Sequence, residues 1–102
     1  MTTKITVIFD NPVDPDAFEA RYSALLRLAR AVPSTTRIET SKVWPKEDGS
    51  STPAYRFIDL YFVDYETASK AVTTAEVSAF VKEILDLATG GVRITFADVE
   101  EN

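Results

Sequence analysis

A chain of 102 residues, 45% hydrophobic and 26% charged, is large enough for one globular domain with a single core. Its net charge of −5 opposes a nucleic-acid partner, because such binding depends on basic side chains that neutralise phosphates. The absence of histidine and cysteine excludes disulfides, thiolate metal sites and histidine-ligated metals, so we expect neither a metal nor an organic cofactor. With no signal peptide and no apolar run long enough for a bilayer, we expect a cytoplasmic protein without a membrane partner.

The first predicted elements are a strand and a helix. The stretch "KITVIF" (4–9) is β-branched and apolar, and it stops at the turn-forming run "DNPVDPD". Asp14 is a suitable N-cap before a proline, and apolar residues then recur at helical spacing from Phe18 to Val32, until Pro33 ends the helix. The acidic run lacks the glycine and the distal glutamate of a calcium loop, so it predicts turns and a cap, not a metal site.

The middle of the chain predicts a long hairpin. "STTRIETSKVW" (34–44) is rich in β-branched residues with polar–apolar alternation, and "AYRFIDLYFV" (54–63) is a second strand-like run. Between them, "PKEDGSSTP" (45–53) concentrates turn-forming residues.

A second helical region follows, and its signals predict an interruption. Asp64 is placed to cap a short helix that runs through Val72. The run "TTAE" then has the form of a capping box, in which Thr73 and Glu76 would satisfy each other's backbone N–H groups at the start of a longer helix.

The last predicted element is the strand "GVRITFADV" (91–99), after Gly90 or Gly91 supplies the left-handed residue that ends the helix. The resulting order, βαββαβ, predicts an α+β ferredoxin-like fold with a four-stranded antiparallel sheet and its helices on one face. We expect a single domain over residues 1–102.

The third strand poses a problem for such a sheet. Alternate side chains of this strand are apolar and would face the helices. The other alternating set, on the opposite face, contains Tyr55, Phe57 and Tyr61, with only Asp59 polar among them. An exposed face with that much aromatic area exceeds what soluble monomers usually tolerate, so it should meet a ligand, another subunit or both. We predict a homodimer that associates through its sheet faces.

Several stretches resemble the EthD family, named for ethyl tert-butyl ether degradation, within the dimeric α/β-barrel superfamily. They are "ITVIFDNPVDPDAFEARY", "YRFIDLYFVDYETASKAV" and "TTAEVSAFVKEILDLATGGV", and their most specific parts are "LYF" (60–62) and "DLATGG" (86–91). The resemblance spans essentially the whole chain. It implies a homodimer whose two sheets close into a barrel, with an internal cleft for a small, mostly apolar molecule.

One family feature is missing from this sequence. In EthD-like proteins the first helix usually carries a tyrosine, with a histidine four residues later. Tyr22 matches the tyrosine, but the histidine position falls on Leu26, or on Leu25 if a one-residue length difference is placed earlier. The role of that histidine therefore does not transfer, and the histidine-ligated haem of other branches of the superfamily is excluded.

Asp59 and Tyr22 are the two candidate catalytic residues. Asp59 is a lone carboxylate in an aromatic run, and desolvation there would raise its pKa and suit it to acid–base chemistry. Tyr22 lies on the apolar stripe of the first helix, where packing is the plainer interpretation. The structural alternative for Asp59 is an ion pair, across the sheet or across the dimer interface, with one of four basic residues, namely Arg37, Lys42, Arg56 or Arg93.

Candidate ligand-binding residues combine apolar bodies with polar tips. They are Trp44, Tyr55, Phe57, Asp59 and Tyr61. Trp44 would equally suit a subunit interface, where tryptophan is often an anchor.

The sequence supports two functions almost equally. One is a small-molecule-binding or accessory protein of a catabolic pathway, which the missing histidine favours. The other is a cofactor-independent enzyme, a lyase, isomerase or oxygenase-like catalyst acting on a small apolar or aromatic compound. RNA binding is a distant third, because the βαββαβ order fits an RNA-recognition motif but the glycines of that motif are absent and the chain is acidic.

Overall fold

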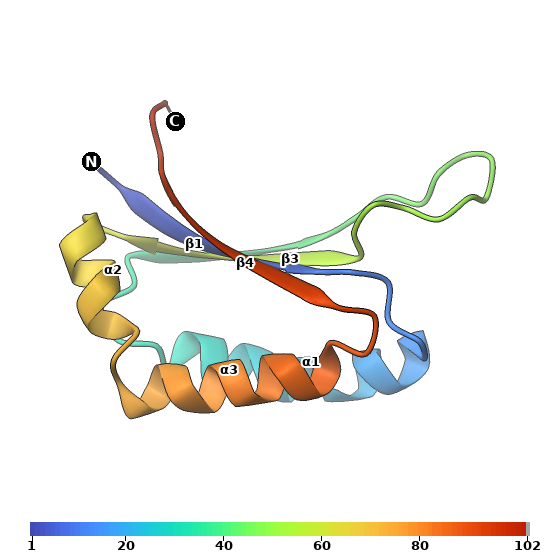
Figure 1. Cartoon of the computed structure of the whole chain (residues 1–102), viewed down its shortest axis with the longest axis horizontal. Coiled ribbons are helices and arrows are strands. Elements are labelled where there is room, and N and C mark those ends of the chain that lie inside the picture. Colours follow the sequence, from blue (N-terminus) through green and yellow to red (C-terminus); the bar gives the residue numbers. More distant parts are fainter. Residues whose placement is uncertain (102) are drawn as a thin grey trace.

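Four strands and three helices follow one another in a computed structural model that describes residues 1–101. In chain order they are β1 (Thr3–Phe9), α1 (Pro15–Arg30), β2 (Arg37–Lys42), β3 (Arg56–Phe62), α2 (Tyr65–Ala71), α3 (Ala75–Leu87) and β4 (Val92–Asp98). All neighbouring strands are antiparallel, in the order β2-β3-β1-β4 (Figure 1). The predicted ferredoxin-like α+β fold is confirmed.

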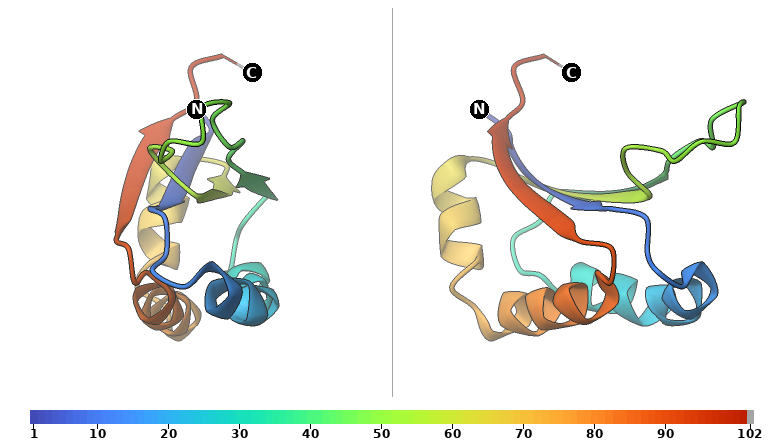
Figure 2. Two further views of the ribbon diagram at one scale, coloured as in Figure 1. Left: turned by 90° about the vertical axis from the view of Figure 1, so that its right-hand side faces the viewer. Right: turned by 45° about the vertical axis from the view of Figure 1, so that its right-hand side comes forward.

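The helices cover one face of the sheet only. Helices α1 and α3 lie side by side beneath it and run in opposite directions, while the short α2 stands at one end (Figures 1 and 2). The other face, which we name the open face, carries no helix within residues 1–101. None of the described helices is long and apolar enough to cross a membrane.

The core forms between the sheet and these helices because strand side chains alternate between faces. Along β1, burial alternates strictly, with every second side chain from Thr3 to Phe9 inside. The two central strands contribute Ile5, Val7, Phe9, Ile58, Leu60 and Phe62 to the core, and the helices contribute Phe18, Leu25, Ala29, Phe80, Ile84 and Leu87. The complementary set of strand residues faces outward on the open face.

Two predicted helix caps are present in the structure. The side chain of Asp14 accepts a hydrogen bond from the backbone N–H of Ala17, and Asp64 caps α2 in the same way through the N–H of Thr67. Each satisfies a backbone donor that has no partner in its helix.

The predicted cap of the following helix was wrong by one residue. Thr74, not Thr73, is the N-cap of α3, and its hydroxyl accepts from the N–H of Val77. The hydroxyl of Thr73 instead donates to the carbonyl of Lys70 at the end of α2. Thr73 therefore still belongs to the preceding helical turn, and the interruption itself is as predicted.

The predicted hairpin is shorter than its sequence pattern. β2 begins only at Arg37, after Ser34 turns the chain with a φ of 68°, and β3 begins at Arg56. Residues 43–54 between the two strands leave the sheet as a protruding segment, which we name the arm. It rises on the side of the open face, as does the chain after β4 at the other end of the sheet (Figure 1).

Gly90 and Gly91 have different structural roles before β4. Gly91 adopts the left-handed conformation, with φ of 109°. A Cβ added at Gly90 would lie 1.8 Å from the carbonyl oxygen of Asn11, so the loop after β1 passes too close for any side chain.

Replacing Gly90 with alanine should therefore lower the free energy of unfolding by about 1–3 kcal/mol, the usual cost of overpacking. Urea unfolding followed by far-UV circular dichroism measures this difference. Gly49→Ala is the comparison, because no atom lies within 4 Å of its added Cβ and any loss there comes from its positive φ. A Gly90→Ala loss below about 0.5 kcal/mol would show that steric contact with Asn11 is not what requires Gly90.

Candidate functional site

An apolar cleft lies between the sheet and α3 on the helix-covered side. It has a volume of about 260 Å³ and is lined by eleven side chains, all of them valine, leucine, isoleucine or phenylalanine. Its two long walls are Val77, Phe80, Val81 and Ile84 from α3, and Ile94 and Phe96 from β4. The cleft thus offers shape and apolar contact, with no hydrogen-bonding side chain in its wall.

The cleft exists because the sheet is wider than the helix layer beneath it. Ile94 and Phe96 lie on the same face as Val7 and Ile5, their direct partners across the strand pair. Ile5 and Val7 are buried, yet Ile94 is 41% exposed and Phe96 44% exposed. β4 is an edge strand that α3 covers incompletely, so its apolar residues form one side of the cleft instead of completing the core.

An aromatic pair lies at this edge. The rings of Tyr65, the first residue of α2, and Phe96 are 6.2 Å apart with a tilt of 59°. This contact joins the short helix to the edge strand beside the cleft.

A second, polar arrangement occupies the open face around Asp59. Although no helix covers it, Asp59 is only 9% exposed. Its Oδ1 accepts a hydrogen bond from the Thr6 hydroxyl at 2.5 Å, and the Lys4 ammonium lies 3.6 Å from the same oxygen. Both partners come from β1, which pairs with β3 so that Thr6 is directly opposite Asp59.

The predicted partners of Asp59 were wrong within one chain, since its ion pair forms with Lys4 and not with Arg37, Lys42, Arg56 or Arg93, and pairing across a dimer interface stays a prediction. The register explains this difference. On the β2 side the residue opposite Asp59 is Glu39, another carboxylate, and Arg37 pairs with Glu39 instead.

Tyr61 and Glu39 form the neighbouring contact on the open face. The Tyr61 hydroxyl donates to Oε1 of Glu39 at 2.7 Å, which raises the pKa of Tyr61 to about 12. The same hydrogen bond, followed by the charge of Arg37, lowers the pKa of Glu39. At neutral pH this pair is a protonated phenol and an ionised carboxylate.

A polar hollow of about 710 Å³ lies on this face between β2 and the chain after β4. Lys4, Arg37, Glu39 and Tyr61 stand in its wall. Sequence reasoning missed three of these residues, Lys4, Arg37 and Glu39, as members of a site. Period-2 alternation places all three on the open face, but the strand registers are needed to bring them together with Tyr61.

Tyr55 lies apart from the other predicted ligand residues. Its ring packs edge-on against Phe18 of α1 at 5.2 Å, and its hydroxyl donates to Glu19 at 3.0 Å. Tyr55 precedes the first residue of β3, so the alternation that places Phe57 on the open face does not extend to it. The structure thus groups Phe57, Asp59 and Tyr61 but separates Tyr55 from them.

Tyr22 is enclosed under the sheet on the helix side. Its ring stacks on Phe18 at 5.6 Å, and the guanidinium of Arg56 lies 4.3 Å from its centre. Burial raises the pKa of the Tyr22 hydroxyl. Tyr22 and Asp59 lie on opposite faces of the sheet, so one substrate does not reach both, and Tyr22 packs in the core.

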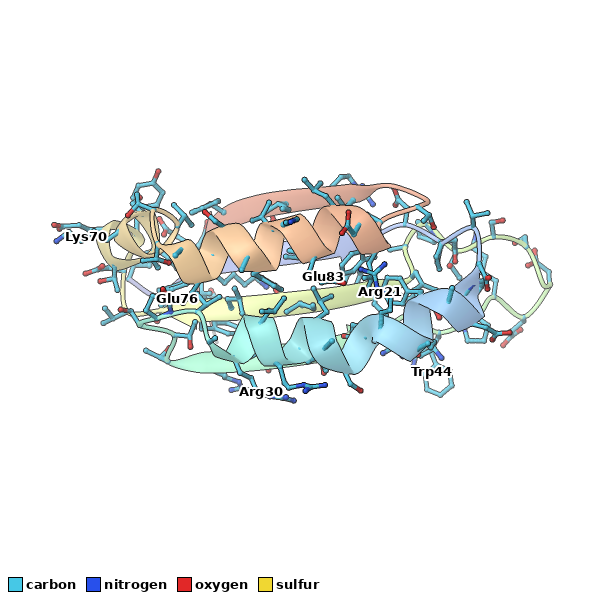
Figure 3. All side chains as sticks on the ribbon, turned by 90° about the horizontal axis from the view of Figure 1, so that it is seen from below. Arg21, Arg30, Trp44, Lys70, Glu76 and Glu83 are labelled. Atoms are coloured by element: carbon cyan, nitrogen blue, oxygen red, sulfur yellow. The ribbon has the colours of Figure 1, made fainter. Side chains whose placement is uncertain are left out.

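Trp44, the remaining predicted ligand residue, is in the arm. It is 87% exposed and projects beyond the edge of the helix layer in Figure 3. Within a single chain it contacts neither the cleft nor the Asp59 cluster.

Comparison with known proteins gives one sequence relative. No protein-family model matches the chain. A protein of Rhodococcus erythropolis, described as an uncharacterized 11.0 kDa protein in the thcB-thcC intergenic region, is 31% identical over 98 residues, which cover 95% of this chain and 94% of that one.

Solved structures share the fold along the whole chain. An ethyl tert-butyl ether (EthD) family protein from Bacillus halodurans has a TM-score of 0.88 at 21% identity, with 97% of this chain and 99% of that chain covered. A dimeric ferredoxin-like protein of unknown function from Jannaschia has a TM-score of 0.69 at 12% identity, covering 97% and 100%. SnoaB, a cofactor-independent oxygenase from Streptomyces nogalater, has a TM-score of 0.68 at 10% identity, covering 99% and 94%.

Proposed function

We propose that this chain, which belongs to the family of the Rhodococcus erythropolis protein and shares the fold of an EthD family protein, is a homodimer that binds a small apolar molecule as an accessory protein of a catabolic pathway. The observation that carries the proposal is the wall of the cleft, made only of aliphatic and phenylalanine side chains. Such a wall gains free energy by removing apolar ligand surface from water.

The size of the cleft sets the size of the ligand. An apolar protein cavity of about 150 Å³ accommodates benzene. A cleft of about 260 Å³ therefore suits a molecule with about ten carbon atoms, such as an alkylbenzene. The proposed site thus differs from the sequence expectation in its position, because it lies between sheet and helix and not between two sheets.

The homodimer would form through the open face. That face carries three basic residues, Lys4, Arg37 and Arg93, and two acidic ones, Glu39 and Asp59, although the whole chain has a net charge of −5. The strands therefore carry no acidic excess on this face, and the further carboxylates beside it, Glu100 and Glu101, belong to the chain after β4. The Jannaschia protein, which shares this fold, is described as dimeric, and this supports a dimeric state for the chain.

Two half-buried apolar residues provide a centre for that interface. Ile8 and Phe57 are direct partners across β1 and β3 and lie on the open face. In a dimer they would leave water completely. The arm and the chain after β4 both rise on this side of the sheet (Figure 1).

Butylbenzene is a direct probe of the cleft. A concentration ten times its Kd should stabilise the protein by about 1.4 kcal/mol, raising the Tm by about 6–11 °C for a domain of this size. The amide resonances of Val77 and Phe80 should shift in a two-dimensional NMR titration. Replacing Ile94 with tryptophan would fill the cleft from the β4 side and weaken butylbenzene binding by about tenfold or more, a loss of at least about 1.4 kcal/mol.

The matched control is Val13→Trp, because Val13 is 81% exposed and does not line the cleft. It should bind butylbenzene as the unsubstituted protein does. Resonance shifts confined to the open face, or equal affinity in the Ile94→Trp variant, would place the ligand elsewhere and refute the cleft as the binding site.

The second candidate function is a cofactor-independent enzyme, the activity named in the description of SnoaB. It is favoured by one observation, the low exposure of Asp59 on a face that dimerisation would enclose. Asp59 would then act as the acid or base. If a turnover is found, Asp59→Asn should abolish it while butylbenzene binding stays unchanged; an unaltered rate would remove Asp59 from the chemistry.

A further inference from the structure

The apolar cleft continues into a shallower hollow on the outer flank of α3. This hollow, of about 400 Å³, shares Val72, Val77 and Val81 with the cleft. It adds Ser78, Lys82 and Leu85, which stand on the surface of α3. The purely apolar wall of the cleft therefore adjoins an outer rim that carries one lysine, Lys82.

Lys82 is free to serve a ligand at that rim. It forms no ion pair within residues 1–101, although Asp86 lies one helical turn further along the same side of α3, because the nearby carboxylates approach Arg21 instead. Glu83 pairs with Arg21 of α1, and the carboxylate of Asp86 lies 3.9 Å from the same guanidinium. Figure 3 shows Arg21 and Glu83 together between the two helices.

We propose, building on the binding function proposed above, that the ligand is an amphipathic monoanion, an alkyl- or aryl-carboxylate whose apolar body fills the cleft while its carboxylate remains at Lys82. A carboxylate placed deeper would lose its hydration with no donor side chain in the cleft wall to replace it. At the rim, the carboxylate keeps its water and gains the ammonium charge. The net charge of −5 disfavours ligands with several negative charges, so a single charged group fits best.

Three probes with the same apolar body test this proposal: butylbenzene, 4-butylbenzamide and 4-butylbenzoate. At low ionic strength and pH 7, the benzoate should bind about three- to fivefold more tightly than the neutral amide, the range of a surface ion pair. That preference should shrink as salt is raised to about 1 M, where screening is nearly complete. Lys82→Gln should abolish the preference and leave butylbenzene affinity unchanged.

The control variant is Lys46→Gln, because Lys46 is an exposed lysine of the arm that does not line the cleft. It should keep the full preference for the benzoate. Equal affinity for benzoate and amide in the unsubstituted protein would overturn the assignment while leaving the apolar cleft intact. A Lys82→Gln variant that weakens all three probes equally would also overturn it, since only the aliphatic stem would then matter.

Failure of the proposed binding function would give a different result in the same experiment. If none of the three probes binds, the cleft is not a ligand site, and the proposed function fails together with the charge preference. Binding of butylbenzene alone supports the cleft and refutes the anionic ligand.

Discussion

Replacing Phe57 with arginine is expected to convert the protein from a dimer to a monomer at micromolar concentration. Phe57 lies beside Ile8 on the open face, outside the core cluster. Two closely packed open faces would enclose an arginine from each subunit, and an unpaired buried charge costs several kcal/mol. Light scattering coupled to size-exclusion chromatography should show the mass fall from two copies to one copy of the 11.3 kDa chain.

Val13→Arg is the control for that substitution, because it adds the same charge at a loop residue far from the open face. It should remain a dimer. Circular dichroism of the Phe57→Arg variant should match that of the original protein, since the core is untouched. A monomeric original protein, or a Phe57→Arg variant that stays dimeric, would contradict association through the sheet faces.

Replacing Phe18 with alanine should cause the largest loss of stability among the substitutions considered. Phe18 is the centre of an aromatic cluster, with ring centroids 5.1 Å from Phe9, 5.6 Å from Tyr22 and 5.2 Å from Tyr55. Truncating such a buried phenylalanine costs about 3–5 kcal/mol. Domains of this kind have total stabilities of about 5–15 kcal/mol, so much of the margin would be lost.

Urea unfolding monitored by circular dichroism measures this loss. Phe18→Leu keeps most of the side-chain volume, so its free energy of unfolding should lie between those of the original protein and Phe18→Ala. This variant can still be measured if Phe18→Ala does not fold. Val13→Ala should change the unfolding free energy by less than about 0.5 kcal/mol, as exposed positions do. A Phe18→Ala loss below 1 kcal/mol would mean that the aromatic cluster does not anchor α1.

The sequence was most informative where local chemistry decides the structure. Asp14 before a proline marks the start of α1, and Asp64 marks the start of α2, because a cap acts on backbone groups within three residues of itself. The wrong prediction of Thr73 as the N-cap of α3 was also local, because the true cap is the next residue. Two adjacent threonines compete for one cap, and only the neighbouring helical turn decides between them.

Contacts between distant segments were less predictable. The partner of Asp59 is Lys4 because β1 pairs with β3 in one particular register, and no pattern within either strand fixes that register. Tyr55 shows a related limit. Alternation predicts its face correctly only while the chain remains in the strand, and β3 starts one residue later.

The candidate cleft could not be predicted from the sequence. Ile94 and Phe96 alternate along β4 in the same way as the core residues of β1. Their partial exposure depends on how far α3 reaches across the sheet, which is a property of packing between elements. The lack of an ion pair at Lys82 within residues 1–101 likewise depends on Arg21, which the carboxylates of Glu83 and Asp86 approach instead.

The arm has a practical consequence for spectroscopy. Trp44 is the sole tryptophan of the chain, and it stands in this protruding segment at 87% exposure. Its fluorescence in a single protomer should already resemble that of indole in water, so loss of the core will barely change the emission. Tryptophan emission is thus a weak signal for unfolding but a selective optical reporter of any surface that the arm meets.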